Sequence, residues 1–166
     1  MTGETIANRY KIQKELFQDS VSITYRAEDI QENQPVLLKI FKEKAEHKPL
    51  ELILRFRREV EQVFKIDHPN ILKIYTRGEY EGKDYVVSEY FEAQSLKSYL
   101  KGSLDIDEAV NIILQLASGL DLAHQKGIIH RSINPSSILV SRAEGKISKL
   151  TDFGIGLLID LSLIHI

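Results

Sequence analysis

The sequence predicts an α+β fold made of two lobes that are joined by a hinge. Up to Phe91, five segments are rich in β-forming residues, and one helical segment lies between the third and the fourth of them. Beyond Phe91 the hydrophobic pattern has the period of a helix, and two short strand-like segments follow it. The change of period between Ser88 and Gln94 indicates the position of the hinge.

The first three predicted strands cover residues 9–17, 20–28 and 34–41. The first two alternate between apolar and polar residues, and the turn "QDS" at 18–20 separates them. The third, "QPVLLKIF", is more apolar than the others. These segments predict the beginning of an antiparallel sheet.

A helix is predicted over residues 50–66, because apolar side chains there follow helical spacing and charges fill the opposite face. Pro69 ends this helical region, since proline disfavours helix at the residue before it. Residues 71–80 and 83–91 then form two strands joined by a glycine-containing turn. The apolar stripe of the helix consists of Leu52, Phe56, Val60 and Val63.

The second half of the chain begins with a long predicted helix. Asp105 followed by Glu108 resembles a capping box at its start, and Gly127 provides a stop. Residues 136–140 and 146–151 are two short strands after it. The apolar stripe of this helix consists of Ala109, Ile112, Leu116, Leu120 and Ala123.

Composition limits the classes of function. The chain has 166 residues, about one domain, and its 24 acidic and 22 basic residues give a net charge of −2. This balance gives no electrostatic reason to expect nucleic acid or an anionic membrane as a partner. With no cysteine, disulfides and thiol chemistry are excluded, and no apolar run resembles a signal core or a membrane span. We therefore expect a cytoplasmic protein.

Six short motifs resemble those of the eukaryotic-type Ser/Thr protein kinase family, in the same order and at similar spacing. They are "VLLK" ending at Lys39, Glu59 in the first helix, "HPNI", the hinge-like "VVSEYF", "HRSINPSSI" and "TDFG" at 151–154. The likeness runs from about Arg9 to about Gly156.

The resemblance implies a truncated protein-kinase-like fold within residues 9–156. A five-stranded antiparallel N-lobe with one helix would occupy 9–89, a hinge 90–94, and a partial, mostly helical C-lobe 95–156. The tail at 157–166, "LLIDLSLIHI", matches no expected kinase segment and looks like a truncated or artefactual end of a reading frame. We assign no function to this tail.

By the same resemblance, the cofactors would be ATP and Mg²⁺. Lys39 and Glu59 would form a charge-assisted pair that holds the lysine toward phosphate, and Asp152 and the position of Ser137 would bind metal. Without these functional roles, Lys39 would be a lysine at a strand edge and Glu59 a solvated residue on the helix surface. Asp152 would then belong to an Asx turn. The positions that would contact the nucleotide are Lys39, Glu59, Leu37, Ser88, Glu89 and Leu139.

The loop "HRSINPSSI" departs from the family where the chemistry is expected. Ser132 replaces the aspartate that accepts or orients the substrate proton, and Asn134 replaces a lysine that stabilises the transferred phosphate. Ser137 replaces an asparagine that binds the second metal. Loss of a positioned base alone costs ~10²–10⁴ in rate.

The phosphate loop and the adenine site are also altered. Phe17, Asp19 and Ser22 stand at the three glycine positions, where glycine lets backbone N–H groups approach phosphates. Leu37 replaces the usual alanine on the strand face that it shares with Lys39. These changes predict weak or no nucleotide binding, and "QDS" is better interpreted as a plain hairpin turn.

Residues that support the family fold are retained. By resemblance, Val63, Ile74, His130 and Phe153 would stack between the lobes, with His130 in a structural role.

Three hypotheses follow. The leading one is a pseudokinase that acts as a regulatory or protein-binding module of a longer bacterial signalling protein, with a protein partner or an output domain in cis. The second is a divergent Ser/Thr kinase with slow phosphoryl transfer that relies on Lys39, Glu59 and Asp152. The third is a fragment that does not fold independently.

Overall fold

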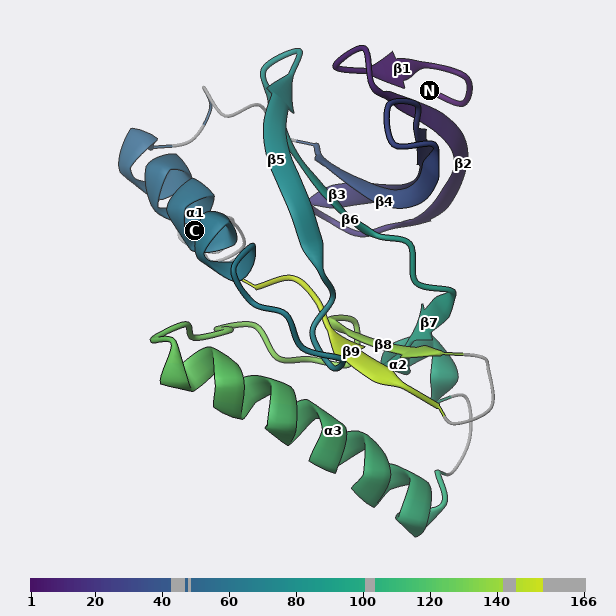
Figure 1. Cartoon of the computed structure of the whole chain (residues 1–166), viewed down its shortest axis with the longest axis vertical. Coiled ribbons are helices and arrows are strands. Elements are labelled where there is room, and N and C mark those ends of the chain that lie inside the picture. The colour runs from purple at the N-terminus through teal and green to yellow at the C-terminus, as the bar shows by residue number, and fades with distance from the viewer. Residues whose placement is uncertain (43–46, 48, 101–103, 142–145, 154–166) are drawn as a thin grey trace. The chain divides into compact units, whose positions relative to one another are not determined.

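The computed structural model describes residues 1–42, 47, 49–100, 104–141 and 146–153 (Figure 1). The chain divides into two compact units. The first comprises Met1–Glu61 and Ile74–Tyr90, and the second comprises Gln62–Lys73 and Phe91–Ile166.

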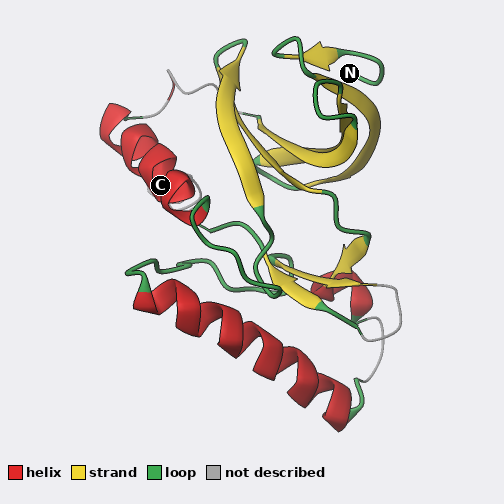
Figure 2. Cartoon of the chain, in the orientation of Figure 1, coloured by secondary structure: helices red, strands yellow, loops and turns green. Residues whose placement is uncertain are grey.

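The first unit is built on a curled antiparallel sheet, as the sequence predicts (Figure 2). Its strand order is β1-β2-β3-β4-β6-β5, so the chain passes from β4 to β5 at the edge of the sheet and then returns with β6 between β4 and β5. The short strand β1 adds to the five predicted strands, and its two residues are too few to show any period. The strands are β1 (Thr5–Ile6), β2 (Tyr10–Gln18), β3 (Ser22–Asp29), β4 (Gln34–Phe41), β5 (Ile74–Tyr80) and β6 (Lys83–Glu89).

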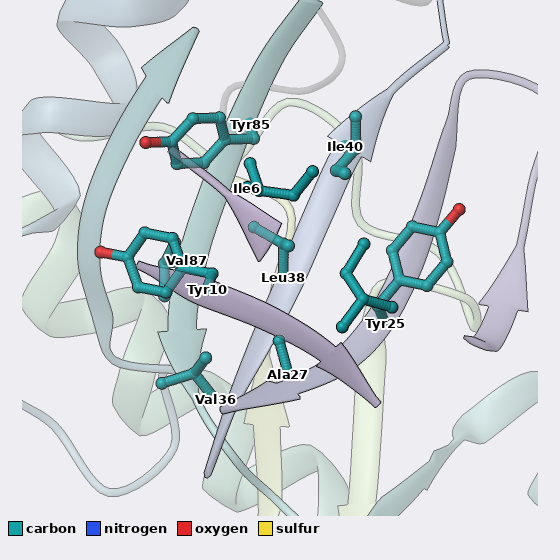
Figure 3. Close-up of a cluster of buried hydrophobic side chains, with 10 residues drawn as sticks. Ile6, Tyr10, Tyr25, Ala27, Val36, Leu38, Ile40, Tyr85 and Val87 are labelled. Atoms are coloured by element: carbon teal, nitrogen blue, oxygen red, sulfur yellow. The ribbon is translucent and has the colours of Figure 1, made fainter. Parts of the chain in front are cut away.

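One face of this sheet carries the apolar core of the first unit (Figure 3). Alternation along the strands brings side chains from all four central strands onto this face, where Ile6 of β1 covers them. Two tyrosine rings, Tyr10 and Tyr85, meet edge to face with centroids 6.1 Å apart. The cluster consists of Ile6, Tyr10, Ile12, Tyr25, Ala27, Val36, Leu38, Ile40, Tyr85 and Val87.

Helix α1 (Leu50–Val63) packs on the opposite face of the sheet. Phe56 is fully buried and its ring meets that of Phe41 at 5.2 Å, while Arg57 Nε donates to Asp84 at 2.8 Å. Phe56, Val60 and Val63 of the predicted stripe are buried, whereas Leu52 is half-buried and Ile53 takes its place in the core. The amphipathic helix is therefore confirmed, and it ends three residues earlier than the predicted Ile66.

The second unit combines helices with a small antiparallel sheet of order β7-β8-β9. Strand β7 pairs Gln94 with Val140, so regular structure begins inside the segment that was predicted as the hinge. The elements are β7 (Ala93–Ser95), α2 (Leu96–Tyr99), α3 (Ile106–Gln125), β8 (Ile138–Ser141) and β9 (Ser148–Leu150). In the described residues, no helix is long and apolar enough to cross a membrane.

Helix α3 buries Ile112, Leu116 and Ala123 of its predicted stripe, together with Gly119. A methyl group at Gly119 would lie 3.2 Å from both the carbonyl oxygen of Asn70 and a side-chain carbon of Ile71. Glycine therefore allows the helix to approach the segment that follows α1.

The ends of α3 differ in how well the sequence predicted them. Asp105 is the N-cap residue, but its side chain makes no capping hydrogen bond, so the predicted capping box is wrong. Glu108 instead accepts hydrogen bonds from the hydroxyl of Tyr99 and from Lys146, which draws its carboxylate away from the helix end. Gly127 adopts a φ of 72°, and the predicted stop is confirmed.

A polar network connects three segments of the second unit. Asn70 Nδ2 donates to Gln115 Oε1 and to the carbonyl oxygen of Ser148, both at 2.9 Å. Gln115 Oε1 also accepts from the backbone N–H of Ser148 at 2.8 Å. Because these buried groups satisfy one another, the network fixes β9 against α3 and positions the chain that leads to Asp152.

Candidate functional site

The sheet face that α1 covers also carries the predicted lysine. Thr24, Lys39 and Val86 are direct cross-strand partners, and Leu37 pairs with Ser88 in the next row of the same face. Opposite residues of antiparallel strands project to the same side, so these side chains form one surface. Lys39 is half-buried, whereas Leu37 and Ser88 are each 6% exposed.

Glu59 lies on the buried side of α1, with 14% of its side chain exposed. It follows Phe56 by three residues, which places it one turn from the contact with Phe41. Phe41 in turn lies two residues after Lys39 on the same strand face. Arg55 Nε donates to Glu59 Oε1 at 3.3 Å. The pairing of Lys39 with Glu59 stays a prediction that this arrangement favours.

The other predicted nucleotide contacts divide between the two units. Glu89 ends β6 in the first unit, where it pairs with Val36. Leu139 is buried in β8 of the second unit, between Ser95 and Lys149 on the neighbouring strands. Their contacts with a nucleotide stay predictions.

Thr24, the cross-strand partner of Lys39, carries a buried hydroxyl on the same sheet face. Its residue is 3% exposed, and its Oγ1 has no hydrogen-bond partner among the described residues. A buried hydroxyl without a partner is costly. Thr24 is thus a polar position on the Lys39 face that the described part of the chain leaves unsatisfied.

The turn between β2 and β3 is closed by its own aspartate. Asp19 Oδ1 accepts from the backbone N–H groups of Val21 at 2.8 Å and of Ser22 at 2.7 Å. Asp19 Oδ2 accepts from the hydroxyl of Ser22 at 2.9 Å. The hairpin turn expected from "QDS" is present, and the carboxylate occupies N–H groups where a phosphate loop would offer them.

His130 is the buried anchor of the loop at 130–137. It is 1% exposed, and its Nε2 lies 2.7 Å from the carbonyl oxygen of Thr151, which can only accept. Nδ1 accepts from the N–H of Ser132 at 3.3 Å, so a neutral ring protonated on Nε2 satisfies both contacts. Burial lowers the pKa of His130, and its contacts with Thr151 and Asp152 oppose this only in part.

The ring of His130 packs against that of Phe153 in a tilted arrangement, with centroids 4.4 Å apart and an angle of 49° between the ring planes. Val63, the third predicted member of the stack in the second unit, is also buried. Ile74 belongs to the first unit, so the complete stack stays a prediction. The structural role expected of His130 agrees with these contacts.

Three altered positions of the loop are joined to one another by hydrogen bonds. Asn134 Nδ2 donates to the carbonyl oxygen of Ser132 at 2.9 Å. Ser137 is 1% exposed, and its Oγ accepts from the N–H of Asn134 at 3.1 Å and lies 3.0 Å from the carbonyl oxygen of Ser132. The side chains of Asn134 and Ser137 therefore stabilise the loop.

The segment that contains Asp152 lies beside this loop. The N–H of Thr151 donates to the carbonyl oxygen of Ser137 at 3.0 Å, which brings the two segments together. Asp152 has a φ of 69° and Arg131 a φ of 64°, both in the left-handed region. Such conformations are uncommon outside glycine and concentrate at functional or tightly determined positions. Gly154, which completes "TDFG", lies outside the described residues.

The described residues fit ATP and Mg²⁺ poorly at two places. Ser137 Oγ is enclosed and engaged in the loop, so it is not available as a metal ligand. Asp19 supplies its own anion at the turn expected to hold phosphates. Across the described ranges, no group of three or more His, Asp or Glu side chains is arranged to hold a metal ion.

Comparisons with known proteins identify the family. The protein kinase domain model matches residues 10–162. The chain is 40% identical over 157 residues to the serine/threonine-protein kinase PrkC of Bacillus subtilis, covering 93% of the chain and 24% of that protein. It is 36% identical over 156 residues to the probable serine/threonine-protein kinase PknB of Lactococcus lactis, covering 92% of the chain and 24% of that protein.

A solved structure agrees with these matches. The crystal structure of the PknI kinase domain of Mycobacterium tuberculosis superposes with a TM-score of 0.82 at 27% identity, covering 93% of this chain and 63% of that one. The chain thus spans about a quarter of the curated relatives, at 24% of each, and less than two thirds of the solved kinase domain. With the fold, the ordered motifs and the family match in agreement, the chain belongs to the protein kinase domain family.

Proposed function

We propose that this kinase domain is a pseudokinase, which serves as a regulatory or protein-binding module instead of transferring phosphate. The observation that carries the proposal is the closed hydrogen-bonding of the loop at 130–137. Ser132 cannot supply a carboxylate, and Asn134 carries no positive charge. Ser137 is buried within the loop. A transferred phosphate would meet neither a base nor a cation at these positions.

The retained features support a role in binding. His130 packs against Phe153, and Asn70 donates a hydrogen bond to Gln115. These contacts preserve the fold without contributing to the chemistry. A domain that keeps its scaffold while losing its reactive groups is suited to recognise a partner or to respond to one.

The alternative is a divergent ATP-dependent Ser/Thr kinase with impaired transfer. It is favoured by the position of α1 against the Lys39 face and by the left-handed backbone at Asp152. The named relatives are serine/threonine-protein kinases, which also favours it. Asp152 would provide the Mg²⁺ ligand and Lys39 the contact to phosphate.

Transfer of labelled γ-phosphate from ATP to the chain itself and to a generic protein substrate separates the two functions. The pseudokinase proposal predicts a signal for the wild-type chain that equals those of Lys39→Ala and Asp152→Ala. A wild-type rate that both substitutions abolish would establish the kinase alternative. Contaminating kinases would give a signal that does not respond to either substitution.

The biological setting is part of the proposal. We propose that the domain lies in the cytoplasm and takes part in signalling. Its target would be a protein partner or an output domain of the same polypeptide. The proposal is supported by the bacterial Ser/Thr kinase relatives, each about four times as long as the part matched here. The balanced charge of −2 favours a protein partner over nucleic acid.

A further inference from the structure

We propose that Asp19 is an internal anion that occupies the N–H groups of the turn between β2 and β3 and thereby selects for ligands without a phosphate at that end. The inference rests on the proposed function, because both concern a kinase-type ligand site that has lost its chemistry. It adds a restriction to that site: a ligand that carries no phosphate at this turn is accepted in preference to a nucleoside triphosphate.

The geometry of the turn carries the inference. The two backbone N–H groups of Val21 and Ser22 converge on a single oxygen, Asp19 Oδ1, at 2.8 and 2.7 Å. Consecutive N–H groups that converge in a turn form a concave anion site. The second oxygen of the same carboxylate accepts from the hydroxyl of Ser22. Both oxygens are engaged, so the site already holds its anion.

The surrounding contacts hold the turn in this form. The N–H of Asp19 donates back to the carbonyl oxygen of Ser22 at 3.0 Å, which closes the hairpin. Lys42 donates to the carbonyl oxygen of Asp19 from its side chain and to that of Val21 from its backbone N–H. Ser22 is 1% exposed, so its donors are fixed in place. The carboxylate is therefore part of a preorganised arrangement.

A phosphate group competes directly with this carboxylate. To reach the N–H groups of Val21 and Ser22, a phosphate oxygen would have to displace Asp19 and leave its charge close by. Hydrogen bonds to charged groups are among the stronger ones, and like charges repel at short range. The phosphate gains no new donor from the turn unless Asp19 moves away.

Binding of Mg·ATP, adenosine and inorganic tripolyphosphate to the 166-residue chain tests the inference, with titration calorimetry as the readout. Asp19→Gly removes both the acceptor and the charge, and Asp19→Ala provides a second form if the glycine variant folds poorly. Asp19→Asn keeps an oxygen acceptor for the two N–H groups and removes only the charge. Glu15→Gln is the matched control, since it removes an exposed negative charge from β2 without touching the turn.

For the wild-type chain we expect ATP to bind no more tightly than adenosine. Asp19→Gly and Asp19→Ala should raise ATP affinity by about tenfold or more, as expected when charge-assisted hydrogen bonds become available, and leave adenosine affinity unchanged. Asp19→Asn should give a smaller gain, and Glu15→Gln none. In the wild-type chain, amide signals of Val21 and Ser22 should not move when tripolyphosphate is added, and in the glycine variant they should.

The inference is wrong if the wild-type chain binds ATP at least about tenfold more tightly than adenosine. It is also wrong if neither Asp19→Gly nor Asp19→Ala gains affinity for ATP, including the case in which neither binds it detectably. Phosphate transfer, measured separately on the same wild-type preparation, reports on the proposed function alone. Failure of the proposed function would appear as phosphate transfer, whereas failure of the inference would appear in the affinities for ATP. The two failures are therefore distinguishable.

Discussion

The hydroxyl oxygen of Ser137 lies 3.0 Å from the carbonyl oxygen of Ser132, so these two residues are joined by a hydrogen bond inside the loop at 130–137. The same hydroxyl accepts from the N–H of Asn134. Ser137 therefore performs a structural task at a position where the family places a metal ligand. The side chain of Ser137 thus belongs to a set of hydrogen bonds within the loop, and these bonds stabilise the loop.

The first prediction concerns this hydroxyl. Ser137→Ala should lower the free energy of unfolding by about 1 kcal/mol, because the N–H of Asn134 loses its acceptor and the buried hydroxyl no longer bonds to the loop. Urea denaturation followed by circular dichroism measures this. Ser136→Ala, at an exposed position of the same loop, should change stability little. Equal effects of the two substitutions would argue against a structural role for Ser137.

The second prediction concerns pH and His130. Burial lowers the pKa of this imidazole below its ordinary value of 6.5, so the unfolded chain binds a proton at a higher pH than the folded chain. Stability should therefore fall as the pH drops below 6.5, with a slope approaching about 1.4 kcal/mol per pH unit from this group. Unfolding free energies measured between about pH 7.5 and 5.5 test this.

Variants separate His130 from the other histidines of the chain. His130→Gln should reduce the pH slope below that of the wild-type chain, whereas His124→Gln, at an exposed position near the end of α3, should leave it in place. An unchanged slope in His130→Gln would mean that another group is responsible. A direct titration of the imidazole signals by NMR would then identify it.

The third prediction concerns the buried hydroxyl of Thr24. Valine has nearly the same shape, so Thr24→Val removes an unsatisfied polar group and should raise the free energy of unfolding by about 1 kcal/mol. Thr76→Val is the comparison, because the hydroxyl of Thr76 donates to the carbonyl oxygen of Arg77 at 3.3 Å. That variant should gain nothing. A loss of stability in Thr24→Val would show that its hydroxyl has a partner.

The fourth prediction concerns the ion pair of Arg9 with Asp29. Nε donates to one carboxylate oxygen at 2.8 Å and a terminal nitrogen donates to the other at 2.7 Å, with the side chain of Asp29 4% exposed. Asp29→Asn should cost about 1–2 kcal/mol, because the arginine loses the charge of its bidentate partner and keeps only the longer contact with the exposed Glu32 at 3.6 Å. Glu28→Gln, one residue earlier, should have little effect. Equilibrium unfolding at neutral pH checks both.

The ion pair of Arg9 with Asp29 also predicts how the stability of the fold changes at acidic pH. Its hydrogen bonds with Arg9 lower the pKa of Asp29 below the ordinary value of 3.8, so its contribution is complete above that value. The contribution is lost as the pH falls below 3.8 through the lower pKa of the folded state. Asp29→Asn should lack this part of the acid transition. An acid transition identical to that of the wild-type chain would contradict the assignment.

The main elements of the fold could be predicted because their side-chain periods are long and clear. The apolar, β-forming run at residues 34–41 predicts β4, and the helical spacing of Phe56, Val60 and Val63 predicts α1. Strands β1 and β7 could not be predicted, since two or three residues show no period. Strand β1 depends on pairing with β2, which follows it, and β7 depends on pairing with β8, which is distant in the sequence. The same is true of the register shifts between β2 and β3.

The candidate site could be predicted by residue type and only partly by role. The resemblance to the kinase family implies that Ser132, Asn134 and Ser137 stand at reactive positions, but it does not indicate that they bond to one another. Those bonds depend on loop geometry that includes the left-handed Arg131. For Asp19 the sequence indicates a turn and a negative charge. That its carboxylate accepts from the N–H groups of the turn is visible only in three dimensions.

The measurement that tests the central claim most directly is a thermal melt of the chain with and without ATP and Mg²⁺. A ligand that binds the folded state at 100 times its dissociation constant stabilises it by about 2.7 kcal/mol, which is readily detected. The account predicts one cooperative transition whose midpoint does not change with Mg·ATP. A clear upward shift that requires Mg²⁺ would contradict it, and a broad transition without cooperativity would indicate a fragment that does not fold independently.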